Sequence, residues 1–192
     1  MSLTAICGMD FLENMGNLKS YLMTLLAKLD QENGCKIYAN YALGFDFIPI
    51  TSFSGLIAEL DTVTDAKVCI DEIQVYFDAY MVPSKKDGTS YFKNFARQTR
   101  KRRIEIRYTA QSFYDVHRSI RKVTSKILLT QKLHMDFTVC RDDNCHKPHI
   151  IKIQRAIYRE NEGLIPVDEP LYMKVLPEIF DLYDTDQIIE IV

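Results

Sequence analysis

Residues 66–70 of this chain form a short apolar run, Ala-Lys-Val-Cys-Ile, that ends directly in two acids, Asp71 and Glu72. An apolar run of this length is typical of a buried strand in a parallel sheet. The carboxyl ends of such strands form the edge at which open α/β sheets bind their ligands. The pattern therefore predicts two carboxylates at a ligand site. The ordinary alternative is a strand that runs into a solvated helix with an acidic cap.

The apolar pattern of the whole chain alternates between short strands and amphipathic helices. We expect strands at 3–7, 36–40, 66–70, 104–110 and 126–130, and helices at 20–29, 53–60, 90–103 and 116–123. This alternation predicts an α/β domain with a mostly parallel sheet flanked by helices. From residue 136 we expect a pair of strands around a turn with cysteine and histidine, and after residue 160 an acidic tail with one strand or short helix. The expected organisation is one domain, 1–192, with a core over about 1–133 and a hairpin and tail over 134–192.

Composition excludes several classes of protein. The 192 residues are 47% hydrophobic, which is enough for one sizeable core, and the formal net charge of -2 argues against a protein that binds DNA by net charge alone. Positive charge is concentrated between Arg97 and Arg107. No apolar run approaches the roughly 20 residues that span a bilayer. Five cysteines, an odd number, indicate a reducing, intracellular setting, so we expect a cytoplasmic protein without a membrane span.

A lysine–serine pair stands at the start of the first expected helix, where residues 16–20 read Gly-Asn-Leu-Lys-Ser. A helix N-terminus offers free backbone N–H groups and a favourable dipole to an anion. In a phosphate-binding loop the lysine contacts the β- and γ-phosphates, and the hydroxyl of the next residue binds Mg²⁺. The pattern GxxxxGK[ST] is not met, because Leu18 precedes Lys19 and Glu13 stands six positions before it. The alternative is a polar helix cap.

The strand expected at 104–110 ends in a polar amide, Gln111, after Tyr-Thr-Ala. In ATPases with an additional strand, a polar residue at this place contacts the γ-phosphate or the attacking water. The alternative is a loop glutamine with only local hydrogen bonds. One long basic helix is expected between Asp71 and Gln111, and this spacing makes the pair more specific than either residue alone.

Taken together, these residues resemble the FtsK–HerA superfamily of DNA-translocating ATPases, and most closely its small viral genome-packaging and zonular-occludens-toxin-like members. The matching stretches are 16–28, 36–41, 68–74, 91–121 and 182–185. The run 95–102 leading into 108–111 is the most specific, and 134–165 is the part least covered. The resemblance implies a RecA-like P-loop ATPase core with an additional strand, a hexameric ring, ATP with Mg²⁺, and double-stranded DNA in the central channel.

By position, the resemblance places Gly16, Asn17, Lys19 and Ser20 in the phosphate loop and assigns Mg²⁺ to Ser20 and Asp71. The family form of the loop would read Gly-Asn-Leu-Gly-Ser-Gly-Lys-Ser, so this chain lacks the inner Gly-Ser-Gly. Those glycines matter because their backbone N–H groups approach the phosphates closely. Either the loop wraps phosphate in a different way, or ATP binding is weakened or lost.

The resemblance also implies the remaining catalytic roles. Glu72 corresponds to the acid that polarises the attacking water, and Gln111 to the sensor. The arginine that acts on a neighbouring subunit lies in the helix before the sensor strand, where Arg100 matches best and Arg97 second. The ordinary interpretation of that basic helix is a solvated or DNA-facing surface.

The function implied first is ATP-driven DNA translocation that packages a viral genome, in the host cytoplasm or on the virion, with a capsid or portal protein as partner. The first alternative is a degenerate nucleotide-binding subunit that scaffolds an active partner. The second is a toxin-like phage-assembly or export ATPase that acts at a membrane.

A cluster of thiols and imidazoles occupies the expected hairpin, and Cys140, Cys145, His146 and His149 lie within ten residues. Such ligands on one hairpin can hold Zn²⁺. Cys145 and His146 are adjacent and would not readily share one ion, so the candidate site consists of Cys140, Cys145 and His149, with His134 able to complete it. The alternative is a reduced hairpin turn without metal.

Overall fold

The computed structural model describes residues 3–9, 17–77, 102–142 and 144–188. Its strands are β1 (Leu3–Gly8), β2 (Lys36–Ala39), β3 (Tyr41–Leu43), β4 (Ile48–Pro49), β5 (Ala66–Ile70), β6 (Glu105–Ala110), β7 (Lys126–His134), β8 (His149–Arg159), β9 (Gly163–Pro166), β10 (Leu171–Lys174) and β11 (Tyr183–Ile188). Its helices are α1 (Lys19–Glu32), α2 (Phe53–Leu60) and α4 (Arg118–Arg121), with short 3-10 turns η1 (Ile73–Val75), η3 (Phe113–Asp115) and η4 (Pro177–Leu182).

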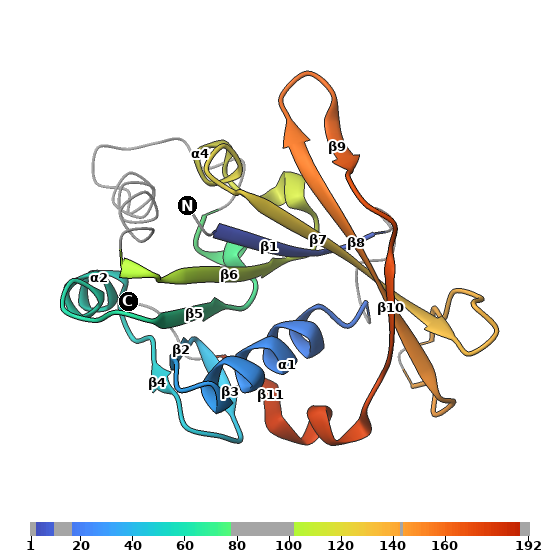
Figure 1. Ribbon diagram of the computed structural model, residues 1–192, viewed down its shortest axis with the longest axis horizontal. Helices are drawn as coiled ribbons and strands as arrows, with labels where there is room; N and C mark the ends of the chain where they lie inside the picture. Colours follow the sequence, from blue (N-terminus) through green and yellow to red (C-terminus); the bar gives the residue numbers. More distant parts are fainter. Residues whose placement is uncertain (1–2, 10–16, 78–101, 143, 189–192) are drawn as a thin grey trace.

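One large sheet organises the fold, with the strand order β10-β8-β7-β1-β6-β5-β2-β4 and β9 paired to β8 (Figure 1). The strands from β7 to β4 run parallel, whereas β8, β9 and β10 join antiparallel. Strand β6 lies between β1 and β5, which is the place of an additional strand beside the strand that leads to α1. The prediction of a mostly parallel α/β sheet with an additional strand is confirmed.

Alternate residues of each parallel strand point to opposite faces of the sheet, and both faces carry buried apolar residues. Both faces are therefore covered by other elements. On one face, α2, η1, η3 and α4 pack over strand residues that include Val68 and Ile106. On the other face, α1 and η4 pack over residues that include Ile6 and Cys69. Figure 1 shows α1 crossing this second face. Helix α1 begins after the carboxyl end of β1, so its N-terminus lies at the ligand edge of the sheet.

The hairpin differs from the prediction in where its first strand lies. The strand predicted at 126–130 continues to His134, and it pairs with β8 along its length. The connection is therefore 135–148, and the strand expected to begin at 136 contributes only an isolated bridge between Leu133 and Val139. The polar residues Thr130, Gln131 and Lys132 interrupt the apolar pattern, so the sequence predicts the end of the strand there. They are nevertheless buried, because β7 pairs with strands on both sides.

Other departures are local. The helix expected at 116–123 is reduced to α4, which follows η3. The helix expected at 90–103 lies almost wholly outside the described residues. After residue 160 the chain forms β9, β10, η4 and β11, which is more structure than the single strand or helix predicted there. In the part of the chain that the structure describes, no helix has the length and apolarity needed to cross a membrane.

A buried ion network fixes the C-terminal half of α1 to the sheet. Arg107 of β6 is 7% exposed, and its guanidinium lies 2.6 Å from Asp30 Oδ2 of α1 and 2.9 Å from Glu105 Oε2. Lys67 of β5 lies 3.2 Å from Glu105 Oε2 and 3.7 Å from Asp30 Oδ1. Two cations thus offset two anions around the buried Arg107, while Asp30, Lys67 and Glu105 are partly exposed. Removing one partner of a fully buried pair destabilises by about 3–5 kcal/mol, and the partial exposure of these groups makes the cost here smaller.

Glu105 makes this network sensitive to acid. Burial alone raises the pKa of Glu105, but Arg107 and Lys67 outweigh it and lower that pKa from 4.5 to about 2. Because the pKa is lower in the folded state, the stabilisation is fully present above about pH 4.5 and is lost as the pH falls toward about 2. We expect the difference in free energy of unfolding between the wild type and Glu105→Gln, measured in urea, to shrink as the pH falls through this window.

Glu162→Gln is the matched control, because it removes an exposed carboxylate of the β8–β9 connection that pairs with Arg159, three residues earlier. Its effect on the free energy of unfolding should be small, below about 1 kcal/mol, at every pH. A Glu105→Gln effect of constant size between neutral pH and about pH 3 would contradict the buried network.

Candidate functional site

The chain enters α1 through Leu18, at the edge of the sheet. Leu18 has φ 59° and ψ 30°, a left-handed conformation that costs residues other than glycine roughly 1–2 kcal/mol. The leucine is half-buried and packs against the hydrophobic cluster beneath α1. It therefore takes a conformation natural to glycine at the position where the phosphate-binding pattern has glycine.

Lys19 and Ser20 are the first two residues of α1. Lys19 is only 9% exposed, and its positive charge acts on the nearby carboxyl groups of Asp71 and Glu72. The Ser20 hydroxyl donates a hydrogen bond to the Asp71 carboxylate, 3.0 Å to Oδ1 and 3.3 Å to Oδ2. The N–H groups of the first turn point out of the helix N-terminus toward the same edge, and the side chain of Leu18 makes no capping hydrogen bond to them.

Asp71 follows β5 and is held from three other elements. Its backbone N–H donates to Asn40 Oδ1 at 2.7 Å, and its carbonyl accepts from Asn40 Nδ2 at 3.1 Å. Its carboxylate accepts hydrogen bonds from the hydroxyls of Ser20 and Thr109. Burial raises the pKa of Asp71, while these hydroxyls and the charge of Lys19 oppose the rise. Asp71 is thus a desolvated carboxylate with its position fixed on both backbone and side chain.

Glu72 takes a left-handed conformation, with φ 53°, directly after Asp71. Its backbone N–H donates to Thr109 Oγ1 at 2.9 Å, and its carboxylate accepts a hydrogen bond from the side chain of Gln111. Burial raises the pKa of Glu72, the charge of Lys19 opposes this, and the charge of Asp71 adds to it. A raised pKa suits a carboxylate that accepts a proton during a reaction.

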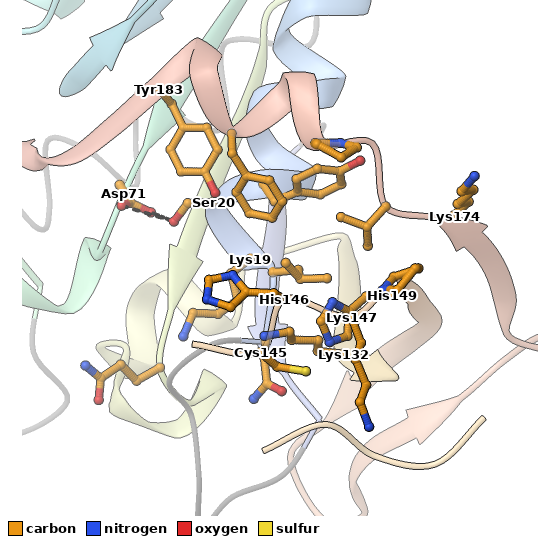
Figure 2. A pocket seen from close by; sticks show the side chains of 18 of the residues that line it. Lys19, Ser20, Asp71, Lys132, Cys145, His146, Lys147, His149, Lys174 and Tyr183 are labelled. Atoms are coloured by element: carbon orange, nitrogen blue, oxygen red, sulfur yellow. Dashed lines mark hydrogen bonds between the residues drawn. The ribbon is translucent and has the colours of Figure 1, made fainter. Parts of the chain in front are cut away.

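These side chains line one cavity of about 890 Å³. Its first wall comes from the start of α1 and the carboxyl ends of β5 and β6: Asn17, Lys19, Ser20, Asp71, Glu72 and Gln111. Its opposite wall comes from the β7–β8 connection and the strands beside it: Lys132, Cys145, His146, Lys147, Pro148, His149 and Lys174. Figure 2 shows the Ser20–Asp71 hydrogen bond on one side and the residues of this connection on the other. Four lysines and two carboxylates line the cavity, which favours an anionic ligand.

The structure thus brings most of the residues singled out in the sequence to one place. Gly16, Arg97 and Arg100 are exceptions because they lie outside the described residues, and Cys140 and His134 are exceptions because they do not line the cavity. Asn40 and Thr109 were missed, although each is a polar residue at the carboxyl end of a strand, and that was the available signal. The lysines of the opposite wall had no such signal, because their position depends on how β7, β8 and β10 fold back.

Asn40→Ala tests how firmly Asp71 is held. Asn40 is fully buried and makes two hydrogen bonds to the Asp71 backbone, so its truncation leaves a buried N–H and a buried carbonyl without these partners. We expect the free energy of unfolding in urea to fall by about 1–3 kcal/mol.

The control is Asn33→Ala, which removes one exposed hydrogen bond to the Leu29 carbonyl at the end of α1. Its cost should stay near 0.5 kcal/mol, roughly the scatter of surface changes. Equal losses in Asn33→Ala and Asn40→Ala would show that Asn40 does not hold Asp71 in the way described.

Comparisons with known proteins bear on the fold. No family model matches the sequence, and no curated protein matches it. The structure is similar to the N-terminal domain of zonular occludens toxin from Neisseria meningitidis, with a TM-score of 0.54 and 15% identity over 95% of this chain and 98% of that one. It is similar to B204, the DNA-packaging ATPase from Sulfolobus turreted icosahedral virus, with a TM-score of 0.54 and 13% identity over 91% and 98% of the two chains.

A third similar structure is the genome-packaging NTPase B204 from Sulfolobus turreted icosahedral virus 2 in complex with AMPPCP. Its TM-score is 0.53, with 10% identity over 91% of this chain and 98% of that one. At such identities the likeness concerns the fold alone. The chain has the RecA-like P-loop ATPase fold, with antiparallel strands β8, β9 and β10 added to one side of the parallel sheet.

Proposed function

We propose that this chain, as a single domain over 1–192, binds and hydrolyses ATP with Mg²⁺ and drives the movement of double-stranded DNA. The observation that carries the proposal is the hydrogen bond between Ser20, at the start of α1, and Asp71, after β5, in a sheet of RecA-like order. In P-loop NTPases the loop hydroxyl and the acid after the strand hold Mg²⁺ together. A hydroxyl and a carboxylate are hard oxygen ligands, so this pair fits Mg²⁺.

The cavity also fits a triphosphate. Lys19 and the first-turn N–H groups of α1 face it from one side, and Lys132, Lys147 and Lys174 line the other. Its volume of about 890 Å³ lies within the roughly 300–1,000 Å³ of small-molecule pockets. ATP with Mg²⁺, when bound, supplies the phosphoanhydride bond that is hydrolysed.

Each polar residue of the first wall has a proposed role. Glu72 orients the attacking water and accepts its proton, and its raised pKa brings it closer to that task. Gln111, hydrogen-bonded to Glu72, senses the state of the γ-phosphate. Lys19 offsets negative charge on the phosphates. Arg100, with Arg97 as the second choice, is proposed to act on the site of a neighbouring subunit, and this role rests on the sequence resemblance.

The link to DNA rests on the similar structures and the sequence resemblance. B204 is a DNA-packaging ATPase, and its counterpart from the second virus was solved with an ATP analogue. By extension we propose a homo-oligomeric ring, a hexamer in the family, that packages a viral genome in the host cytoplasm or on the virion together with a capsid or portal protein.

One observation favours a different role. Leu18, in place of glycine, keeps a side chain on the cavity wall close to the place where phosphates would lie. A leucine there favours a degenerate subunit that binds nucleotide weakly and scaffolds an active partner.

The likeness to the toxin domain keeps an export ATPase as a further candidate. Calorimetric titration with ATP separates the scaffold from the ATPase, and stimulation by duplex DNA separates the DNA motor from the export ATPase.

Glu72→Gln tests the catalytic assignment. The amide keeps the size of the side chain but cannot accept a proton, so ATP should bind within about twofold of the wild-type affinity while turnover falls by about 10²-fold or more. Binding is measured by calorimetry, and turnover by phosphate release with and without duplex DNA. Glu32→Gln, at the exposed far end of α1, is the matched control and should leave both unchanged.

Three results would count against the proposal. Wild-type turnover in Glu72→Gln would remove the role given to Glu72. Absence of ATP binding to the wild-type protein would favour the scaffold. Hydrolysis that duplex DNA leaves unchanged at every concentration would contradict a DNA motor.

A further inference from the structure

Four potential metal ligands meet at the wall of the cavity, which two of them line: His134, Cys140, Cys145 and His149. Their ligand atoms all lie within 4.8 Å of one another. His149 Nε2 is 3.2 Å from Cys140 Sγ, and the rings of His134 and His149 stack with centroids 5.2 Å apart. Tetrahedral Zn²⁺, with bonds of about 2.3 Å to sulfur and 2.0–2.1 Å to nitrogen, holds its ligand atoms roughly 3.3–3.8 Å apart. The four atoms are therefore close to the spacing of a tetrahedral site.

The backbone of the hairpin accounts for this meeting. In the β7–β8 register His134 lies directly opposite His149, so both imidazoles stand on the same face of the two strands. The chain after β7 then folds back on itself, and the N–H of Cys140 donates to the Lys132 carbonyl at 3.0 Å. This returns one thiol to the histidine pair, and Cys145 brings the other from the far part of the connection.

The connection 135–148 has almost no apolar core of its own. Among its described residues only Cys140 is buried and only Cys145 is half-buried. Its large apolar side chains face solvent, with Met135 53% and Phe137 59% exposed. A small segment that lacks a core is commonly held by a disulfide or a metal. Both cysteines are free thiols, which leaves the metal as the device that fits.

A polar atom without a partner supports the same conclusion. His134 Nδ1 is buried and has no hydrogen-bond partner among the described residues, a condition that costs free energy in a folded protein. Two thiols and two imidazoles are the ligand set that suits Zn²⁺ rather than Mg²⁺ or Ca²⁺. Two thiolates would also neutralise the charge of the ion, so a partly buried site need not hold a net charge.

We propose that His134, Cys140, Cys145 and His149 bind one Zn²⁺ ion that holds the β7–β8 connection in place. Four protein ligands leave no open position on the metal, which makes the site structural and not catalytic. The connection carries His146 and Lys147 to the lining of the cavity that Lys19 also lines, so the ion also fixes that part of the wall. Only this last consequence rests on the proposed ATP site, because metal binding can be measured without nucleotide.

The primary test is the zinc content of untagged protein after dialysis against metal-free buffer, measured by inductively coupled plasma mass spectrometry. We expect about one zinc per chain. The zinc retained by Cys140→Ser and by Cys145→Ser should be at least tenfold lower, because each variant lacks one of the four ligands. Cys35→Ser is the matched control, because Cys35 is also half-buried but lies outside the cluster, and this variant should retain the metal.

Two further measurements do not depend on the folding of variants. Wild-type protein refilled with Co²⁺ should show the visible bands of a tetrahedral ion together with thiolate-to-metal charge transfer. A chelator should lower the midpoint of thermal unfolding of the wild type and of Cys35→Ser. It should not lower that of Cys140→Ser, which has no ion to lose.

The proposal is overturned if wild-type protein neither retains zinc nor gives the tetrahedral cobalt spectrum, or if both cysteine variants keep as much zinc as the wild type. A disulfide between Cys140 and Cys145 in the native protein, detected by mass under non-reducing conditions, would also overturn it. Zinc binding without ATP hydrolysis would contradict the proposed function alone. ATP hydrolysis by wild-type protein that neither retains zinc nor gives the cobalt spectrum would contradict the zinc site alone.

Discussion

The hydrogen bonds that hold Asp71 are the constraint on which the cavity depends. A carboxylate that is 2% exposed has lost its hydration, and the loss is tolerable only where hydrogen bonds replace the water. Asn40 after β2, Ser20 on α1 and Thr109 on β6 supply those bonds. One side chain and its backbone therefore join three elements to the end of β5, and the same contacts set the distance between the helix N-terminus and the sheet.

Helix α1 is positioned at both ends by polar contacts. Ser20 meets Asp71 at the cavity, and Asp30, roughly 15 Å further along the helix, meets Arg107 under the sheet. Between these points the apolar side of the helix packs on the second hydrophobic cluster. The helix cannot slide along the sheet without breaking one contact or the other. The placement of Lys19 thus depends on an ion network far from the cavity that it lines.

The core of the fold could be predicted from the sequence because its strands are buried on both faces and read as short apolar runs. Residues at the carboxyl ends of those runs, such as Asp71 and Gln111, then marked the site. The full length of β7 was missed because its polar residues are covered by pairing with strands remote in sequence. Strands β9 and β10, after residue 160, were missed because neither has a buried residue, so no core-facing pattern marks them. The left-handed turn at Leu18 could not be foreseen, since no local preference of leucine favours it.

The most direct test of this account is a crystal structure with a non-hydrolysable ATP analogue and Mg²⁺. We expect Mg²⁺ at about 2.1 Å from Ser20 Oγ, with Asp71 as a direct ligand or one bridged by water. We also expect Lys19 Nζ within hydrogen-bond distance, about 2.7–3.2 Å, of a phosphate oxygen. Nucleotide density elsewhere on the molecule, or a bound triphosphate that Lys19 and Ser20 do not touch, would contradict it.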